Sequence, residues 1–379
     1  MIFDYITLKI IWFILIAILL AGFAIMGGSD MGVSALLPMV GKKDDERRVL
    51  INTIGPMWEG NQVWLILAAG AIFAAWPIAY ATAFSGMYYA LFLVLATLII
   101  RPPGFDYRSK INSLKWRKAW DVCLFLSGVV PALVFGVGVG NLFLGVPFYF
   151  DITAMPFYTG TFFGLLNPFA LLIGLVSLGL LCTQGALFIQ AKTEGVLQAR
   201  AKIMSRLFGL LFIASFILAG FWVHKVLIGY QITFIPDLNT AMSVQAKTVE
   251  RLAGAWSGNY QQWPYFWAVP FLTICFVLCS MMLSTFNYVK TAVLVHSCAI
   301  LGCVATAATA LFPFVMPSSR FPSHSLTVWD VASSHMTLQW MFWAVVILLP
   351  IVLLYTTWVV RVFRGPLREE TVAANPDSY

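Results

Sequence analysis

The chain has 379 residues, of which 60% are hydrophobic and only 10% are charged, and its mean hydropathy is +0.86. Charged residues at this frequency cannot cover the surface of a soluble protein of this length. The composition therefore excludes a water-soluble enzyme and predicts an integral membrane protein. The net charge of +7 follows from basic residues between the apolar segments, and a nucleic-acid partner is not needed to explain it.

Nine apolar segments of about 20 residues each predict nine transmembrane helices. Each segment is continuously apolar instead of alternating, which favours an all-α polytopic fold over a β-barrel. The first segment lacks a small-residue cleavage site and follows Asp4, so we expect a mature helix and not a secretory signal. The predicted spans are 10–26, 53–76, 81–100, 122–139, 162–189, 204–229, 265–286, 291–316 and 338–360.

The basic residues predict the orientation of these helices. If the N-terminus is periplasmic, 18 of the 23 Lys and Arg residues lie on the cytoplasmic side, as the positive-inside rule requires. An odd number of spans then places the C-terminus in the cytoplasm. We expect residues 1–379 to form one transmembrane domain with a cytoplasmic tail at 362–379, and two four-helix bundles plus one peripheral helix fit the count.

Cysteine and histidine residues offer two alternatives to a purely structural role. Cys275 and Cys279 are four residues apart on one predicted helix, a spacing that suits a metal pair, but no matched third ligand follows. His296 is the only histidine well inside a predicted span. A single histidine there is more often hydrogen-bonded in the core than ligated to haem, so we predict packing roles for all three residues.

Two ionisable residues lie where predicted spans end. Asp30 follows the first span in the sequence GGSDMG at 27–32, where glycines permit either a sharp turn or close helix packing. Arg101 ends the third span, and Pro102 stops that helix. Each has a structural alternative, namely capping of the next turn for Asp30 and interfacial snorkelling for Arg101.

Glu59 begins the second span, with Trp58, Asn61 and Gln62 as neighbours. An acid inside an otherwise apolar span is costly and is a functional candidate by default. By topology Asp30, Glu59 and Arg101 approach the same cytoplasmic membrane level. Such a group is compatible with a proton entry site or with a structural ion-pair cluster, and the sequence does not separate the two.

Several long motifs make the chain similar to a known family. The motifs are WEGNQVWLI at 58–66, FAAWP at 73–77, RPPGFDYR at 101–108, FPFVMPSS at 312–319 and SLTVWD at 325–330. Together they resemble subunit II of cytochrome bd-type quinol oxidases. The resemblance extends from the first span to the tail.

This resemblance implies a complex of the bacterial inner membrane that oxidises quinol, reduces O2 to water and generates a proton gradient. In the family, subunit I carries the quinol site, two b haems and one d haem, so we expect no haem ligands in this chain. Subunit II is expected to stabilise subunit I, with a small single-helix accessory subunit and membrane lipids as further partners. Whether a structural quinone or lipid is bound in this subunit stays open.

The resemblance also suggests roles for individual residues. Glu59 and Asp30 become candidates for a cytoplasmic proton path. The structural or partner-contact candidates are Trp58, Asn61, Arg101, Asp106 and Arg108.

Three positions depart from the family pattern. Gly27 stands where relatives often have an acid, Glu59 replaces a common Asp, and Met57 occupies a position where His can occur. A path that needs both acids of the first motif is therefore questionable in this chain.

A transporter or channel that uses Asp30, Glu59 and Arg101 on a substrate is the alternative function. Transporters place polar groups and broken helices near the membrane midplane. Here the acids gather near one face and the span centres are apolar, which favours the oxidase subunit.

Overall fold

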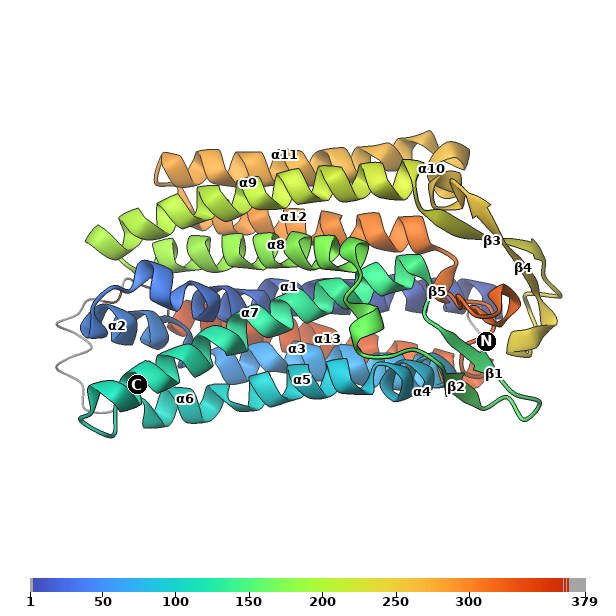
Figure 1. Ribbon diagram of the computed structural model, residues 1–379, viewed down its shortest axis with the longest axis horizontal. Coiled ribbons are helices and arrows are strands. Elements are labelled where there is room, and N and C mark those ends of the chain that lie inside the picture. Colours follow the sequence, from blue (N-terminus) through green and yellow to red (C-terminus); the bar gives the residue numbers. More distant parts are fainter. Residues whose placement is uncertain (1–2, 364, 366, 368–379) are drawn as a thin grey trace.

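The protein is an elongated bundle of helices that run along a common long axis in a computed structural model, which describes residues 3–363, 365 and 367 (Figure 1). The helices are α1 (Tyr5–Val40), α2 (Asp44–Ile54), α3 (Trp58–Ala75), α4 (Pro77–Gly86), α5 (Tyr88–Ile99), α6 (Arg101–Tyr107), α7 (Leu114–Leu144), α8 (Pro168–Lys192), α9 (Gly195–Lys225), α10 (Gly258–Gln262), α11 (Ala268–Thr285), α12 (Val289–Leu311) and α13 (His335–Val362).

Eight helices of the described chain are long and apolar enough to cross a membrane, and α3 with α4 makes a ninth if this bent pair is one span. This confirms an all-α polytopic membrane protein. The pair is bent by 118° at its break. Pro77 is the first residue of α4, a position that tolerates proline because its missing N–H would have no partner in the helix. The predicted span 53–76 includes the end of the separate helix α2 as well as α3. The predicted span 81–100 includes the second half of α4 as well as α5.

The first helix is much longer than predicted, and it passes through Asp30 without a break. The prediction that Asp30 ends this helix is wrong. The glycines around it instead permit close packing on α8: a Cβ on Gly32 would lie 2.2 Å from the carbonyl oxygen of Leu181, and one on Gly185 would lie 2.3 Å from the backbone of Gly32. Small residues allow such close approach of helices in membranes.

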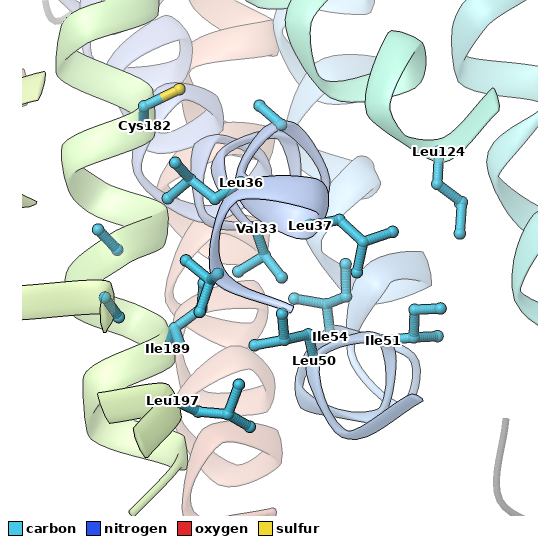
Figure 2. Packing of buried hydrophobic residues seen from close by; sticks show 14 of the residues in the cluster. Val33, Leu36, Leu37, Leu50, Ile51, Ile54, Leu124, Cys182, Ile189 and Leu197 are labelled. Atoms are coloured by element: carbon cyan, nitrogen blue, oxygen red, sulfur yellow. The ribbon is translucent and has the colours of Figure 1, made fainter. Parts of the chain in front are cut away.

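A buried apolar cluster surrounds the turn from α1 into α2 (Figure 2). Leu36 and Leu37 of α1 lie among Leu50 and Ile54 of α2, with Ile189 of α8 alongside. All five side chains are nearly inaccessible to solvent. This packing holds the short helix α2 against α1 and α8 at one end of the bundle (Figure 1) and so positions the start of α3, which carries Glu59 and Asn61.

Three antiparallel strand pairs lie at the end of the bundle where α1 begins (Figure 1). Lys247 and Asp330 form a buried ion pair in this region, and Lys9 of α1 donates to the carbonyl oxygens of Leu238 and Trp329 at 2.9 Å each. These contacts fix the connecting segments over the helix ends. The pairs are β1 (Phe148–Phe150) with β2 (Pro156–Tyr158), β3 (Ile228–Phe234) with β4 (Thr248–Ala253), and β5 (Phe314–Met316) with β6 (Leu326–Thr327).

Candidate functional site

A buried polar cluster joins α1, α3, α6 and α7. Asp30 of α1 is fully buried, and its Oδ1 accepts a hydrogen bond of 2.9 Å from Nδ2 of Asn61 on α3. Arg101, at the start of α6, lies within electrostatic range of Asp30, and its Nη2 donates to the backbone carbonyl of Ser127 on α7 at 2.7 Å. The structure therefore brings three of the residues predicted from the sequence into one site.

The charges in this cluster compensate each other only in part. A buried carboxylate is tolerated when a cation and hydrogen-bond donors replace water. Arg101 is 1% exposed and faces inward, so the snorkelling alternative for this residue is wrong. Within the described chain, Oδ2 of Asp30 and Nε of Arg101 are buried without a hydrogen-bond partner. One oxygen of the Asp30 carboxylate therefore has no hydrogen-bond donor from the described part of the chain.

Glu59 lies outside this cluster. It is exposed on the surface of α3, whereas Asn61, two residues later, is 4% exposed and faces Asp30. Two positions along an α-helix are about 200° apart, so the two side chains point to opposite sides of α3. No hydrogen bond or ion pair of Glu59 occurs among the residues that the structure describes. The structure brings Asp30 and Arg101 together but separates Glu59 from both.

Trp58 and Asp106 have different surroundings. The ring of Trp58 packs against that of Phe105, with centroids 6.0 Å apart, and so connects α3 to α6. Asp106 is exposed and forms no ion pair within the described part of the chain. Trp58 therefore has a packing role in this chain, and Asp106 faces outward.

Arg108 is the centre of an ion-pair network that the sequence did not reveal. Its Nε is 2.6 Å from Oδ1 of Asp121, and its Nη2 is 2.7 Å from Oδ1 of Asp44. Arg117 also binds Asp44, at 2.6 Å, and Arg47 binds Asp121, at 2.7 Å. The opposite charges of α2, α6 and α7 are the only sequence signal of this network, because residues 44 and 121 are far apart along the chain.

The network predicts a pH-dependent contribution of Asp44 to stability. Burial alone raises its pKa, but Arg108 and Arg117 outweigh this effect and hold the pKa below its ordinary value of 3.8. The ionised Asp44 carboxylate therefore stabilises the fold at pH values above 3.8. This stabilisation is lost as the pH falls through the lowered pKa. We expect Asp44→Asn to reduce the free energy of unfolding by about 1 kcal/mol at pH 7. Thermal unfolding of the variant and the parent should converge as the pH falls through the lowered pKa of Asp44; a constant difference would contradict the ionic role.

Two cavities lie near the start of α3, and only the smaller one is lined by a residue of the cluster. The larger has a volume of about 220 Å³, and the smaller of about 10 Å³. Met57 lines both, and Asn61 lines the smaller one. The other residues around the larger cavity are Asn52, Thr53, Pro56, Lys192, Phe363, Gly365 and Leu367.

Each of the four histidines has a polar contact within the chain. His296, the intramembrane histidine, interacts through Nε2 with the carbonyl oxygen of Leu180 at 3.0 Å, and its Nδ1 is 3.4 Å from Oγ of Ser280. In the described residues no group of three or more His, Cys, Asp or Glu side chains could hold a metal ion. The remaining contacts are His224 with Ser257, His324 with Phe150 and His335 with Phe3.

Comparison with known proteins shows the family. Residues 8–363 match the family described as cytochrome bd terminal oxidase subunit II. The chain is also 46% identical over 375 residues to cytochrome bd-I ubiquinol oxidase subunit 2 of Escherichia coli strain K12, with 99% of each chain covered. The chain belongs to the cytochrome bd oxidase subunit II family. It is therefore a subunit of a quinol oxidase, a haem-containing complex that includes a subunit I.

Other relatives agree with this membership. The bd oxidase subunit is 34% identical over 363 residues to cytochrome bd ubiquinol oxidase subunit 2 of Bacillus subtilis strain 168, with 94% of this chain and 96% of the other covered. It shares its fold with a chain of the bd oxidase from Geobacillus thermodenitrificans, with a TM-score of 0.64, 16% identity and coverage of 94% and 98%.

Proposed function

We propose that this subunit stabilises the haem-bearing subunit I of a bacterial inner-membrane quinol:O2 oxidoreductase and supplies part of its cytoplasmic proton path. The single observation that carries the proton path is Asp30, a fully buried carboxylate with one oxygen bound to Asn61 and the other free. A carboxylate in a desolvated site can take up and release a proton near neutral pH. Asp30 therefore carries the proton, Asn61 orients the carboxylate, and Arg101 compensates its charge.

The orientation in this proposal places the ends of α2 and α6 in the cytoplasm and the strand pairs in the periplasm. Its support is the distribution of basic residues, of which 18 of 23 belong to the connections on the cytoplasmic side. The proposal treats residues 1–379 as one transmembrane domain. Most of the expected cytoplasmic tail at 362–379 lies outside the described residues.

The exposed face of α3 is the proposed contact with subunit I. This face begins at Glu59, which is exposed. It continues through three apolar side chains, Val63 (38% exposed), Ile66 (70%) and Phe73 (59%). A carboxylate facing lipid is costly, so a protein partner with a polar group opposite Glu59 is the more favourable cover. Helix α13 buries only Leu338 among its described residues, so we propose it as the one peripheral helix in an arrangement of two four-helix bundles plus one helix.

In this arrangement the two acids have separate tasks. Asp30 of α1 lies in the interior of the subunit beside Asn61 of α3, and Glu59 faces the proposed partner from the opposite side of α3. A proton that reaches Asp30 must pass around the start of α3 to leave toward subunit I. Glu59 is the acid that receives it at the interface.

The haems are proposed to lie on subunit I, together with the quinol site. The hydrogen bonds of the four histidines of this chain support this division. Haem supplies the electron transfer to O2 when the complex is assembled. A reduced-minus-oxidised spectrum of the purified complex tests the proposal: His296→Ala should leave b- and d-type bands in place, and loss of one haem would contradict it.

Glu59→Gln tests the role of the second acid. We expect the complex to assemble with its full haem content, while quinol-driven oxygen uptake falls about ten-fold, because the amide cannot relay a proton. Asp106→Asn is the matched control, since Asp106 is an exposed acid that follows the next span at the same end of the bundle. Oxygen uptake at the parent rate in both variants would show that Glu59 has a structural role only.

A further inference from the structure

The helices α9, α11 and α12 contain no acidic residue. Residues 195–236 and 252–329, which include all three helices, have no Asp or Glu. Three cations, Lys202, Arg206 and Lys290, lie at the end of the bundle where α9 begins and α11 is followed by α12. None of the three forms an ion pair within the described part of the chain. Cations without a carboxylate partner at a membrane surface attract anionic headgroups.

Two of these cations converge on the end of α11. The ammonium group of Lys202 donates to the backbone carbonyl of Thr285 at 3.1 Å and to Oδ1 of Asn287 at 2.8 Å. Nη2 of Arg206 donates to Oγ1 of Thr285 at 3.1 Å. A guanidinium group has five N–H donors in a fork that matches the oxygens of a phosphate. Arg206 is exposed, so its remaining donors are available to a ligand, and the exposed Lys290 follows just beyond the turn.

Two apolar stripes start at the hydrogen bond between α9 and α11. On α9, Leu210 and Ile217 follow Arg206 after four and eleven residues. On α11, Met282 and Leu278 precede the threonine by three and seven residues. Such spacings place side chains on one face of a helix. All four apolar side chains are between 48% and 62% exposed, so each stripe runs along the outer surface away from the cations.

The two stripes belong to helices that pack directly on each other. A Cβ on Gly209 of α9 would lie 2.7 Å from Sδ of Met281 on α11, so the absence of a side chain lets the helices approach closely. Figure 1 shows α9 and α11 on the side of the bundle away from α3 and α5. A partner that docks on α3 therefore leaves this surface uncovered, and the acyl chains of lipids are its natural contact.

We propose that this surface binds an anionic phospholipid, with the phosphate on Arg206 and Lys290 and the acyl chains along the stripes of α9 and α11. Lys202 is a positioning residue, because it holds the turn after α11 through Thr285 and Asn287. A zwitterionic lipid brings its own cation to the headgroup, and no carboxylate of α9, α11 or α12 is present to receive it. The surface therefore selects a headgroup with net negative charge. This inference does not involve the acids of the proposed proton path.

A photoactivatable phosphatidylglycerol tests this surface. The purified complex is reconstituted in phosphatidylcholine nanodiscs that contain the probe at a low, fixed mole fraction, and peptide mass spectrometry locates the adducts after illumination. We expect adducts on the stripes of α9 and α11, and a much lower yield there with a photoactivatable phosphatidylcholine that has the same chains. Combining Arg206→Gln with Lys290→Gln should lower the phosphatidylglycerol adduct yield about thirty-fold, the factor for losing two cations at a lipid surface.

Lys118→Gln is the matched control. Lys118 is an exposed cation at the same end of the bundle, but it lies on α7. Its loss should leave the adduct yield on α9 and α11 unchanged. A loss as large as that of the double variant would show a diffuse surface charge and would overturn the site.

The comparison of the two probe lipids needs only the parent complex, so it decides the proposal even if the double variant does not assemble. Equal adduct yields with phosphatidylglycerol and phosphatidylcholine would overturn the selectivity for an anionic headgroup. An absence of adducts on α9 and α11 would show that a protein partner covers this surface, and it would overturn the lipid site. The labelling needs no turnover, so its outcome is separate from the effect of Asp30→Asn on oxygen uptake.

Discussion

Asp30→Asn is expected to slow quinol-driven oxygen uptake by about 10²-fold, the lower range for loss of a positioned proton-transfer group, while haem content stays at the parent level. Asp30→Asn leaves the buried charge of Arg101 uncompensated, so the variant should unfold at a lower temperature than the parent, but the amide is close in size to the carboxylate and can still pack beside Asn61 and Arg101. It cannot, however, bind and release a proton. Oxygen electrode rates, normalised to the haem spectrum of the purified complex, measure the effect.

Asp30→Glu is the matched variant for this prediction. It retains the carboxylate and changes only its reach, so it should recover a measurable part of the lost turnover. If Asp30→Asn turns over at the parent rate, Asp30 and Arg101 form a structural ion-pair cluster, which is the alternative that the sequence leaves open. If both variants are equally slow, the position of the carboxylate matters more than its proton.

Arg101→Met is expected to give the largest loss of stability. The guanidinium group is 1% exposed, beside a fully buried carboxylate, and it donates to the carbonyl of Ser127. Removing one partner of a buried pair leaves an uncompensated charge and costs about 3–5 kcal/mol. We expect a lower yield of assembled complex and a lower melting temperature, measured by thermal unfolding in detergent or nanodiscs.

The double variant Asp30→Asn with Arg101→Met separates charge from packing. Without the carboxylate no buried negative charge is left, so the double variant should recover most of the stability lost in Arg101→Met. Thermal unfolding of all four members of this cycle gives the coupling between the two side chains. Simple additivity of the two single effects would show that Arg101 stabilises the fold through Ser127 alone.

Local composition was sufficient to predict the all-α membrane fold. A span needs about 20 apolar residues because the lipid core has a fixed thickness and every backbone polar group must be satisfied within the helix. Those demands act on consecutive residues, so hydropathy alone finds the helices. The same reasoning placed the end of α1 too early, because Gly27, Gly28 and Asp30 resemble a turn and only the packing of Gly32 on α8 shows a continuous helix.

The candidate site needed more than local composition. Asp30, Asn61 and Arg101 were all named from the sequence, but that Asn61 binds Asp30 follows from the side of α3 that faces α1. The same rotation of α3 turns Glu59 outward. Asp44 and Asp121, the partners of Arg108, had no signal in the sequence beyond their charge.

The order of residue types along the chain was enough to show that it crosses the membrane many times, which ionisable residues lie near the ends of its spans, and which family it resembles. Each of these depends on residue type and order along the chain. The tertiary structure alone decided which of those residues meet, because helix rotation and close glycine contacts act between segments that are distant in sequence. Asp30 therefore became the centre of the site, and Glu59 became a residue of its outer face.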